Sequence, residues 1–174
     1  MPPQPELRVR ALGEADAQAY KALRDQALAH HEEAFTSDAA TEAKRGADSY
    51  FARLGANADG AFTLGAWRGA RLVGAISCER DTRCKVRHLG HVVGTMVAPD
   101  EQGNGTGREL LRALIERASA DHELHLLTLS VTASNQAAVR LYLRAGFTRY
   151  GTLPRAIRIA GRFLDKDLML KDLR

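Results

Sequence analysis

A glycine-rich segment, Gln102–Arg108, carries the clearest chemical signal in this chain of 174 residues. Its glycines, Gly103, Gly105 and Gly107, occupy alternate positions, so the backbone can adopt unusual φ values and approach a ligand closely. A strongly patterned helix follows, and its first N–H groups and positive dipole end suit a phosphate. The side chain of Arg108 could add a charge-assisted contact. The segment is therefore a candidate phosphate-binding loop, although glycines alone also fit a connection that binds nothing.

The spacing of this loop excludes two common phosphate motifs. Arg108 occupies the place of the last glycine in the dinucleotide pattern G-x-G-x-x-G. No G-K-[ST] sequence follows, as a P-loop would require. A phosphate loop of another kind is therefore expected.

The elements around the loop follow an α/β pattern. The helix after it has one apolar face, and residues 124–131 are nearly all apolar or β-branched, as in a strand buried on both faces. A glycine inside the preceding strand, Gly90 or Gly94, predicts a bulge, and Pro99 ends that strand. Strands are predicted at 7–10, 62–67, 72–79, 85–97, 124–131, 147–153 and 162–170, with helices at 14–31, 39–54, around 110–118, and at 135–145.

Two segments together resemble the GNAT family of N-acetyltransferases. Gln102-x-x-Gly105-x-Gly107 matches the signature [RQ]-x-x-G-x-[GA] of that family, and it lies between the expected strand and helix. Residues 135–147 match its second coenzyme segment, N-x6-Y-x3-G-F. The tail at 161–169 resembles a bacterial subgroup whose substrates are mostly unassigned. The resemblance covers the chain from Leu7 onward.

The resemblance implies a fold and a coenzyme. The fold would be α/β, with a mixed, mostly antiparallel central sheet, a V-shaped splay between two parallel central strands, and helices on both faces. The pyrophosphate of acetyl-CoA would rest on the amides of Gly103, Asn104, Gly105, Thr106, Gly107 and Arg108, after Gln102. The pantetheine arm would pair with backbone at Met96, Val97 and Ala98, and Asn135 would contact it. The N–H of Val97 would polarise the thioester carbonyl.

The resemblance also implies that Tyr142 is the general acid that protonates the leaving thiolate, because a phenol and a thiol have similar acidities. The alternative is a tyrosine that only packs within its helix. Asn135 has a second possible role as the N-cap of that helix, and the two roles are compatible.

The general base is less certain from the sequence. Many relatives carry glutamate six residues before the closing valine of the long strand, and that position is His91 here. Neutral histidine accepts a proton near pH 7, directly or through water. A packed histidine without a chemical role is an equal alternative, and His88 is the nearby rival.

The expected function is transfer of an acetyl group from acetyl-CoA to a primary amine by direct attack in a ternary complex. The alternative is a non-catalytic acetyl-CoA-binding sensor or regulatory module. The acceptor amine is unidentified, and a homodimer is possible. No metal site is expected, because no metal-ligand spacing is present.

The bulk composition fits one soluble domain at residues 7–174, after a disordered start at residues 1–6. The net charge of +4 comes without the clustered bases and interleaved aromatics of a nucleic-acid-binding protein. Neither a secretory signal nor a membrane-spanning segment is evident, so a cytoplasmic location is expected. The two cysteines, Cys78 and Cys84, should then be reduced.

Overall fold

The computed structural model describes residues 5–55 and 60–174. The predicted disordered start at residues 1–6 falls mainly on residues 1–4, which lie outside the described residues. No helix in the described ranges combines the length and apolar character that crossing a membrane requires.

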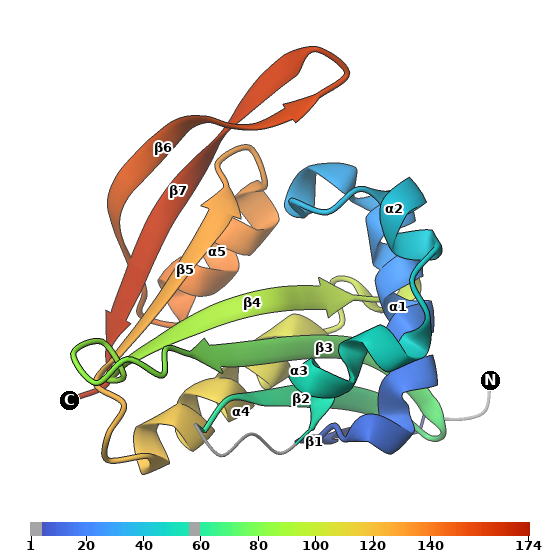
Figure 1. The fold of residues 1–174 in the computed structure, drawn as a ribbon, viewed down its shortest axis with the longest axis horizontal. Helices are drawn as coiled ribbons and strands as arrows, with labels where there is room; N and C mark the ends of the chain where they lie inside the picture. Colours follow the sequence, from blue (N-terminus) through green and yellow to red (C-terminus); the bar gives the residue numbers. More distant parts are fainter. Residues whose placement is uncertain (1–4, 56–59) are drawn as a thin grey trace.

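A seven-stranded sheet forms the centre of the molecule (Figure 1). The strand order is β1-β2-β3-β4-β5-β7-β6, and β4 and β5 are parallel whereas the other neighbours are antiparallel. This mixed, mostly antiparallel sheet confirms the predicted fold class. The strands are β1 (Leu7–Ala11), β2 (Phe62–Arg68), β3 (Arg71–Arg80), β4 (Leu89–Val97), β5 (Leu126–Thr132), β6 (Thr148–Ile159) and β7 (Arg162–Asp172).

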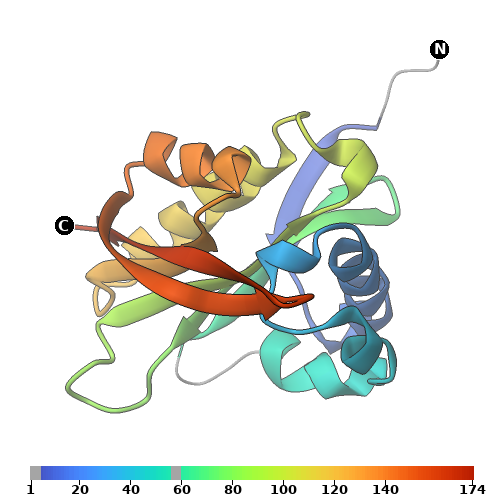
Figure 2. The same ribbon diagram turned by 90° about the horizontal axis from the view of Figure 1, so that it is seen from above.

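Helices cover both faces of the sheet (Figure 2). One face carries α1 (Ala17–His30), α2 (Ala39–Ala43) and α3 (Phe51–Leu54), and the other carries α4 (Thr106–Ala120) and α5 (Gln136–Arg144). Four 3-10 turns join them: η1 (Glu14–Asp16), η2 (Glu32–Ala34), η3 (Ala47–Tyr50) and η4 (Pro99–Glu101). The apolar stripe of α4 packs on the sheet as predicted, with Leu110, Leu111, Leu114 and Ala118 buried.

The two parallel strands diverge after a short paired stretch. They pair only at Leu89 with Leu126, Gly90 with Leu127, and His91 with Thr128. Beyond His91, β4 and β5 separate into the predicted V-shaped splay (Figure 1).

A bulge in β4 lies within this splay. Ala75 of β3 pairs with Met96 and Ser77 pairs with Val93, so Gly94 and Thr95 together oppose one residue. Gly94 has a φ of +61°, which glycine adopts without strain. Gly94 is therefore the bulge residue. Gly90 instead permits close packing, because a Cβ there would lie 2.8 Å from Leu127 Cδ2.

Three predicted element boundaries were wrong. The helix expected at 39–54 divides into α2, η3 and α3, because Gly46 adopts an extended conformation (φ −70°, ψ 159°) in a polar stretch. The strand expected at 85–97 begins at Leu89, because turn hydrogen bonds occupy residues 83–89. The strand expected to end at 153 continues to Ile159, since β6 is an edge strand and an edge tolerates Pro154.

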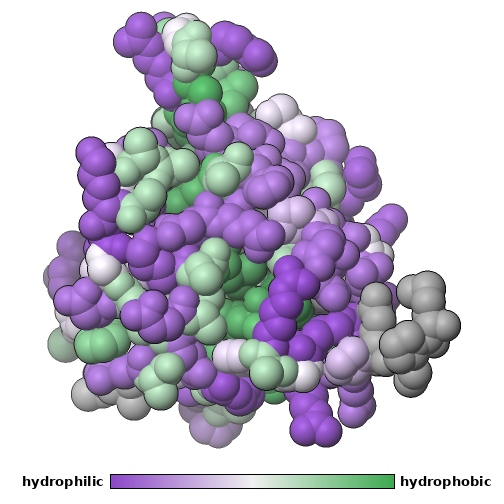
Figure 3. Space-filling model, turned by 90° about the vertical axis from the view of Figure 1, so that its right-hand side faces the viewer, coloured by the Kyte–Doolittle hydropathy of each residue, from purple (hydrophilic) through white to green (hydrophobic). Residues whose placement is uncertain are grey.

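The β6–β7 hairpin projects beyond the rest of the molecule (Figures 1 and 3). Figure 3 looks onto the side where α1 and α2 lie, and hydrophobic surface gathers on the hairpin at the top. Leu153 and Phe163 of the hairpin are each about half exposed, at 52% and 53%.

Candidate active site

A cavity of about 1290 Å³ lies beside the glycine-rich loop. The glycine-rich loop, α4, α5 and the end of β4 line it, and the end of α1 and η2 close one side. Every predicted loop residue from Gln102 to Arg108 is in its lining, as are Met96, Val97 and Asn135. The cavity therefore brings together most of the predicted coenzyme-binding residues.

Two glycines of the loop have left-handed backbone. The φ angle is +81° at Gly103 and +83° at Gly105, and Gly105 is the N-cap of α4. Gly107 lies within α4 and needs no such conformation. The helix geometry leaves the amides of Thr106, Gly107 and Arg108 without intrahelical acceptors at the wall of the cavity. Such a helix N-terminus has the geometry and charge that suit an anion.

Arginines add positive charge to the same wall. Arg108 and Arg112 of α4 and Arg140 and Arg144 of α5 line the cavity. The side chain of Arg108 is 77% exposed and lies 3.6 Å from Glu109, whereas Arg112 is paired with both Glu109 and Glu116. The cavity thus combines helix amides with arginine side chains, a combination suited to phosphates.

Tyr142 lies on α5 with its ring buried against Phe147. Burial raises the pKa of its phenol, and a hydrogen bond with Thr95 partly offsets this effect. Thr95 is the second residue of the β4 bulge and lines the cavity. The phenol is therefore directed to the bulge and stays protonated at neutral pH.

His91 is outside the cavity lining. It occupies the last paired position of β4 before the splay, and its Nδ1 lies 2.7 Å from the Oγ1 of Thr128 on β5. The same hydroxyl is 3.5 Å from the carbonyl oxygen of Gly90. His88 precedes β4 and packs its ring edge-on against His125, farther along the strand from the bulge.

Three other predicted residues have structural contacts of their own. Asn135 Oδ1 accepts a hydrogen bond from the N–H of Ala138, so Asn135 is the N-cap of α5. The N–H of Ala98 donates to the carbonyl of Val73, and Ala98 is buried outside the cavity. The amide nitrogen of Gln102 lies 2.6 Å from Nε2 of His31.

Sequence reasoning missed Thr95 and the η2 segment. Thr95 follows Gly94, one of the two glycines at which the sequence predicted a bulge, so its place next to that glycine could have identified it. The Oγ1 of Thr132 donates to the carbonyl of Glu33, and this contact holds η2 against the splay. This hydrogen bond joins residues that are 99 positions apart in the chain, so no local sequence pattern predicts it. Among residues 5–55 and 60–174, no group of three or more His, Cys, Asp or Glu side chains could hold a metal ion.

Comparison with known proteins places the chain in a family. Residues 19–147 match the profile of the Acetyltransferase (GNAT) family, so the chain belongs to that family. The Salmonella typhimurium protein yncA, solved with its cofactor acetyl-CoA, has a TM-score of 0.83 and 25% identity, covering 97% of this chain and 95% of that one.

Two curated relatives match over shorter segments. The L-methionine sulfoximine/L-methionine sulfone acetyltransferase of Pseudomonas paraeruginosa is 39% identical over 77 residues, 44% of this chain and 44% of the relative. The mycothiol acetyltransferase of Pseudarthrobacter chlorophenolicus is 34% identical over 140 residues, 78% of this chain and 40% of the relative. The matches thus span less than half the length of these relatives.

Proposed function

We propose that this protein transfers an acetyl group from acetyl-CoA to a primary amine by direct attack within a ternary complex. One observation supports this most: the glycine-rich loop at the start of α4 opens on a large cavity that reaches the β4 bulge beside Tyr142. Acetyl-CoA supplies an activated acyl thioester. The acceptors in the two relatives' names differ, so they do not identify the acceptor of this chain.

The cavity fits a large phosphorylated co-substrate. Its volume exceeds that of ordinary small-molecule sites, which are about 300–1,000 Å³. The amides of Gly103 to Arg108 would hold the pyrophosphate, and Arg140 and Arg144 would face other phosphate charge. The edge of β4 at Met96 and Val97 faces the splay, so its backbone groups there can pair with an extended ligand arm.

The proposed reaction has one bond-making step. The amine nitrogen attacks the thioester carbonyl carbon, the C–N bond forms, and the C–S bond breaks. Tyr142 donates its proton to the leaving sulfur, and the N–H of Val97 stabilises the carbonyl oxygen. The amine proton passes to His91 through water, because three strand residues, about 10 Å, separate His91 from Gly94.

Thr128 positions His91 in this scheme. If its hydroxyl donates to the carbonyl of Gly90, the hydroxyl oxygen accepts from Nδ1–H of His91. The lone pair is then on Nε2, which becomes the proton acceptor.

Initial velocities with acetyl-CoA and an amine acceptor, both varied, test the mechanism. Intersecting lines and an unmodified enzyme in the mass spectrum are expected for direct attack. Parallel lines with an acetylated protein would indicate a covalent intermediate instead. Tight binding of acetyl-CoA without turnover of any amine would favour the sensor alternative.

A further inference from the structure

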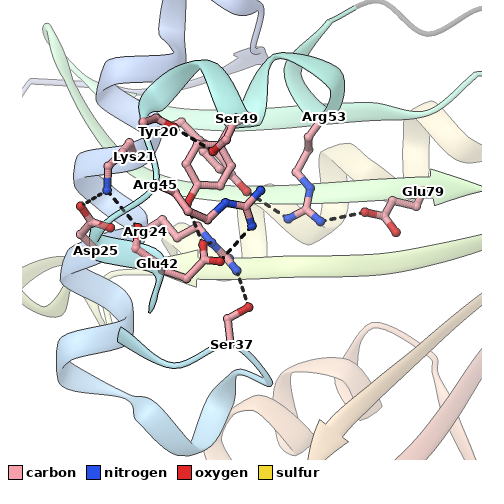
Figure 4. Close-up of polar contacts among 12 residues, drawn as sticks. Tyr20, Lys21, Arg24, Asp25, Ser37, Glu42, Arg45, Ser49, Arg53 and Glu79 are labelled. Carbon is pink, nitrogen blue, oxygen red and sulfur yellow. Dashed lines mark hydrogen bonds and ion pairs between the residues drawn. The ribbon is translucent and has the colours of Figure 1, made fainter. Parts of the chain in front are cut away.

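A second cavity, of about 480 Å³, lies on the opposite face of the sheet from α4. It is enclosed by α1–α3 and η3 on one side and by β2 and β3 on the other (Figure 4). Its charged lining residues are Arg24, Arg45, Arg53, Arg80, Glu42 and Glu79. Four carboxylates match these four arginines, because Asp121 and Glu123, outside the lining, both pair with Arg80.

Arg53 lies where this cavity meets the β4 bulge. Its Nη1 is 3.5 Å from the Tyr20 hydroxyl, and a Cβ on Gly94 would be 3.4 Å from the same nitrogen. Thr95, the next residue of the bulge, lines the first cavity. Arg53 of the second cavity therefore lies close to the bulge that the first cavity reaches.

The other arginines of this cavity are held by carboxylates. Arg24 and Arg45 both pair with the buried Glu42, at 2.8 and 3.1 Å. Arg80, with its side chain 4% exposed, pairs with Asp121 and Glu123. These contacts fix three of the four guanidinium groups.

Arg53 differs because its partner is exchangeable. Its Nη2 is 2.8 Å from Glu79 Oε1, and the Glu79 side chain is 49% exposed. An ion pair with such a solvated carboxylate contributes little to stability, because water screens the attraction. A ligand carboxylate can replace Glu79 at little cost, and a guanidinium can bind it through two hydrogen bonds.

We propose that this second cavity is the acceptor site and that Arg53 binds a carboxylate of the acceptor, so the acceptor is an amino acid or a similar small amino-carboxylate. The inference rests on the proposed transfer function. In an α-amino acid the amine is two bonds from the carboxyl carbon. A carboxylate on Arg53 therefore places the amine beside the bulge, whereas a polyamine such as spermidine has no carboxylate for Arg53 to bind.

Matched acceptors test this assignment in the wild-type protein. Release of the CoA thiol from acetyl-CoA is measured with each L-amino acid, with the corresponding L-amino acid amide, and with spermidine. The best amino acid should have a kcat/KM at least tenfold above that of its amide, and spermidine should be poorer still. Equal or better turnover of the amides or of spermidine, or no turnover of any amino acid, would overturn the proposal.

Two substitutions with opposite expected signs give a second test. Arg53→Gln should lower kcat/KM for the best amino acid at least tenfold, mainly through KM, and leave its amide unchanged. Glu79→Gln should lower KM for the amino acid several-fold, because it removes the competing carboxylate. Arg71→Gln is the matched control, since Arg71 forms an exposed ion pair with Asp100 at 2.6 Å, outside the lining of the second cavity.

Titration of each variant with acetyl-CoA separates the two proposals. If acetyl-CoA affinity is unchanged but Arg53→Gln and Glu79→Gln affect acid and amide equally, the carboxylate site is wrong. The proposed transfer function would still hold in that case. If the wild-type protein binds no acetyl-CoA, both the transfer function and the carboxylate site are contradicted. The effect of Glu79→Gln on KM can be measured without the arginine variant. The carboxylate site can therefore still be tested if Arg53→Gln does not fold.

Discussion

Tyr142 is the residue on which the proposed chemistry depends most. Its hydroxyl is hydrogen-bonded to Thr95 in the bulge, and burial raises its pKa. Burial keeps the proton on the phenol, and the hydrogen bond holds the hydroxyl at the bulge, where Thr95 lines the cavity.

Substitution of Tyr142 by phenylalanine removes only that proton donor. We expect kcat to fall about 100-fold, since general acid catalysis contributes at least that much, with acetyl-CoA affinity unchanged. Steady-state kinetics and calorimetric titration measure the two quantities. Tyr150→Phe is the control, because Tyr150 is 56% exposed on β6. Equal turnover by Tyr142→Phe and wild type would remove Tyr142 as the acid.

The His91 proposal predicts a change in the pH profile. His91→Ala should lower kcat most near neutral pH, with a smaller loss at high pH, where more of the acceptor is free amine. Thr128→Val should reproduce part of this loss, and Thr128→Ser should retain the wild-type profile because it keeps the hydroxyl. His88→Ala serves as the control. A profile of unchanged shape in His91→Ala would contradict the assignment.

At the scale of elements, the loop before α4 can be tested with two equivalent glycines. Gly105 and Gly161 have φ angles of +83° and +80°, and a Cβ meets no atom closer than 3.7 Å at either position. Alanine at each should therefore cost about 1–2 kcal/mol of stability through backbone strain.

Only one of these two substitutions should affect the coenzyme. Gly105→Ala should weaken acetyl-CoA binding about tenfold, equivalent to about 1.4 kcal/mol, because it shifts the loop amides. Gly161→Ala, at the β6–β7 turn, should leave the dissociation constant unchanged. Equal affinities for the two variants, measured by calorimetry, would mean that the loop amides do not hold the coenzyme.

A buried ion pair stabilises the layer of α1 and α2 (Figure 4). Arg24 Nε is 2.8 Å from Glu42 Oε2, and their side chains are 9% and 4% exposed. Burial alone would raise the pKa of Glu42, but hydrogen bonds from Tyr50 and Arg24 outweigh it and lower the pKa to about 2. The same contact and burial raise the pKa of Tyr50 to about 12.

Glu42→Gln should destabilise the protein by about 3–5 kcal/mol at pH 7, because it leaves the charge of Arg24 buried without its partner. Since the folded-state pKa of Glu42 is lowered, its contribution is complete above about pH 4.5 and is lost as the pH falls toward 2. Urea unfolding of both proteins across this range measures the difference. Glu116→Gln, in an exposed pair, is the control; a difference that does not shrink in acid would contradict the pKa assignment.

At the scale of the whole molecule, two cavities lie near the β4 bulge: Thr95 lines the first, and Arg53 of the second lies close to Gly94. The donor would enter from the side of α4 and α5, and the acceptor from the side of α1–α3. The splay between β4 and β5 is the opening between them, so the fold itself would supply the geometry of a ternary complex.

The sequence predicted the features that short-range patterns encode. Gly105 and Gly107 identified the loop, Gly90 or Gly94 predicted a bulge, and the apolar stripe of α4 predicted the helix that packs on the sheet. These features depend on neighbouring residues, and the family resemblance added the mixed, mostly antiparallel sheet and its splay.

The remaining features depend on contacts between distant residues. The contact of His91 with Thr128 follows from the register of β4 and β5, and the position of Arg53 close to Gly94 follows from the packing of α3 on the sheet. Residues 39–54 appeared continuous because the polar Gly46 region has no strong stop signal. Periodicity within one segment does not report such contacts.

Thermal melting with ligands tests the central claim most directly. The protein is heated with saturating acetyl-CoA, with desulfo-CoA, and with NAD as the control. A ligand that binds only the folded state raises the melting temperature, so both CoA species should raise it and NAD should not. No shift with either CoA species would contradict the account, because the glycine-rich loop would then bind no coenzyme.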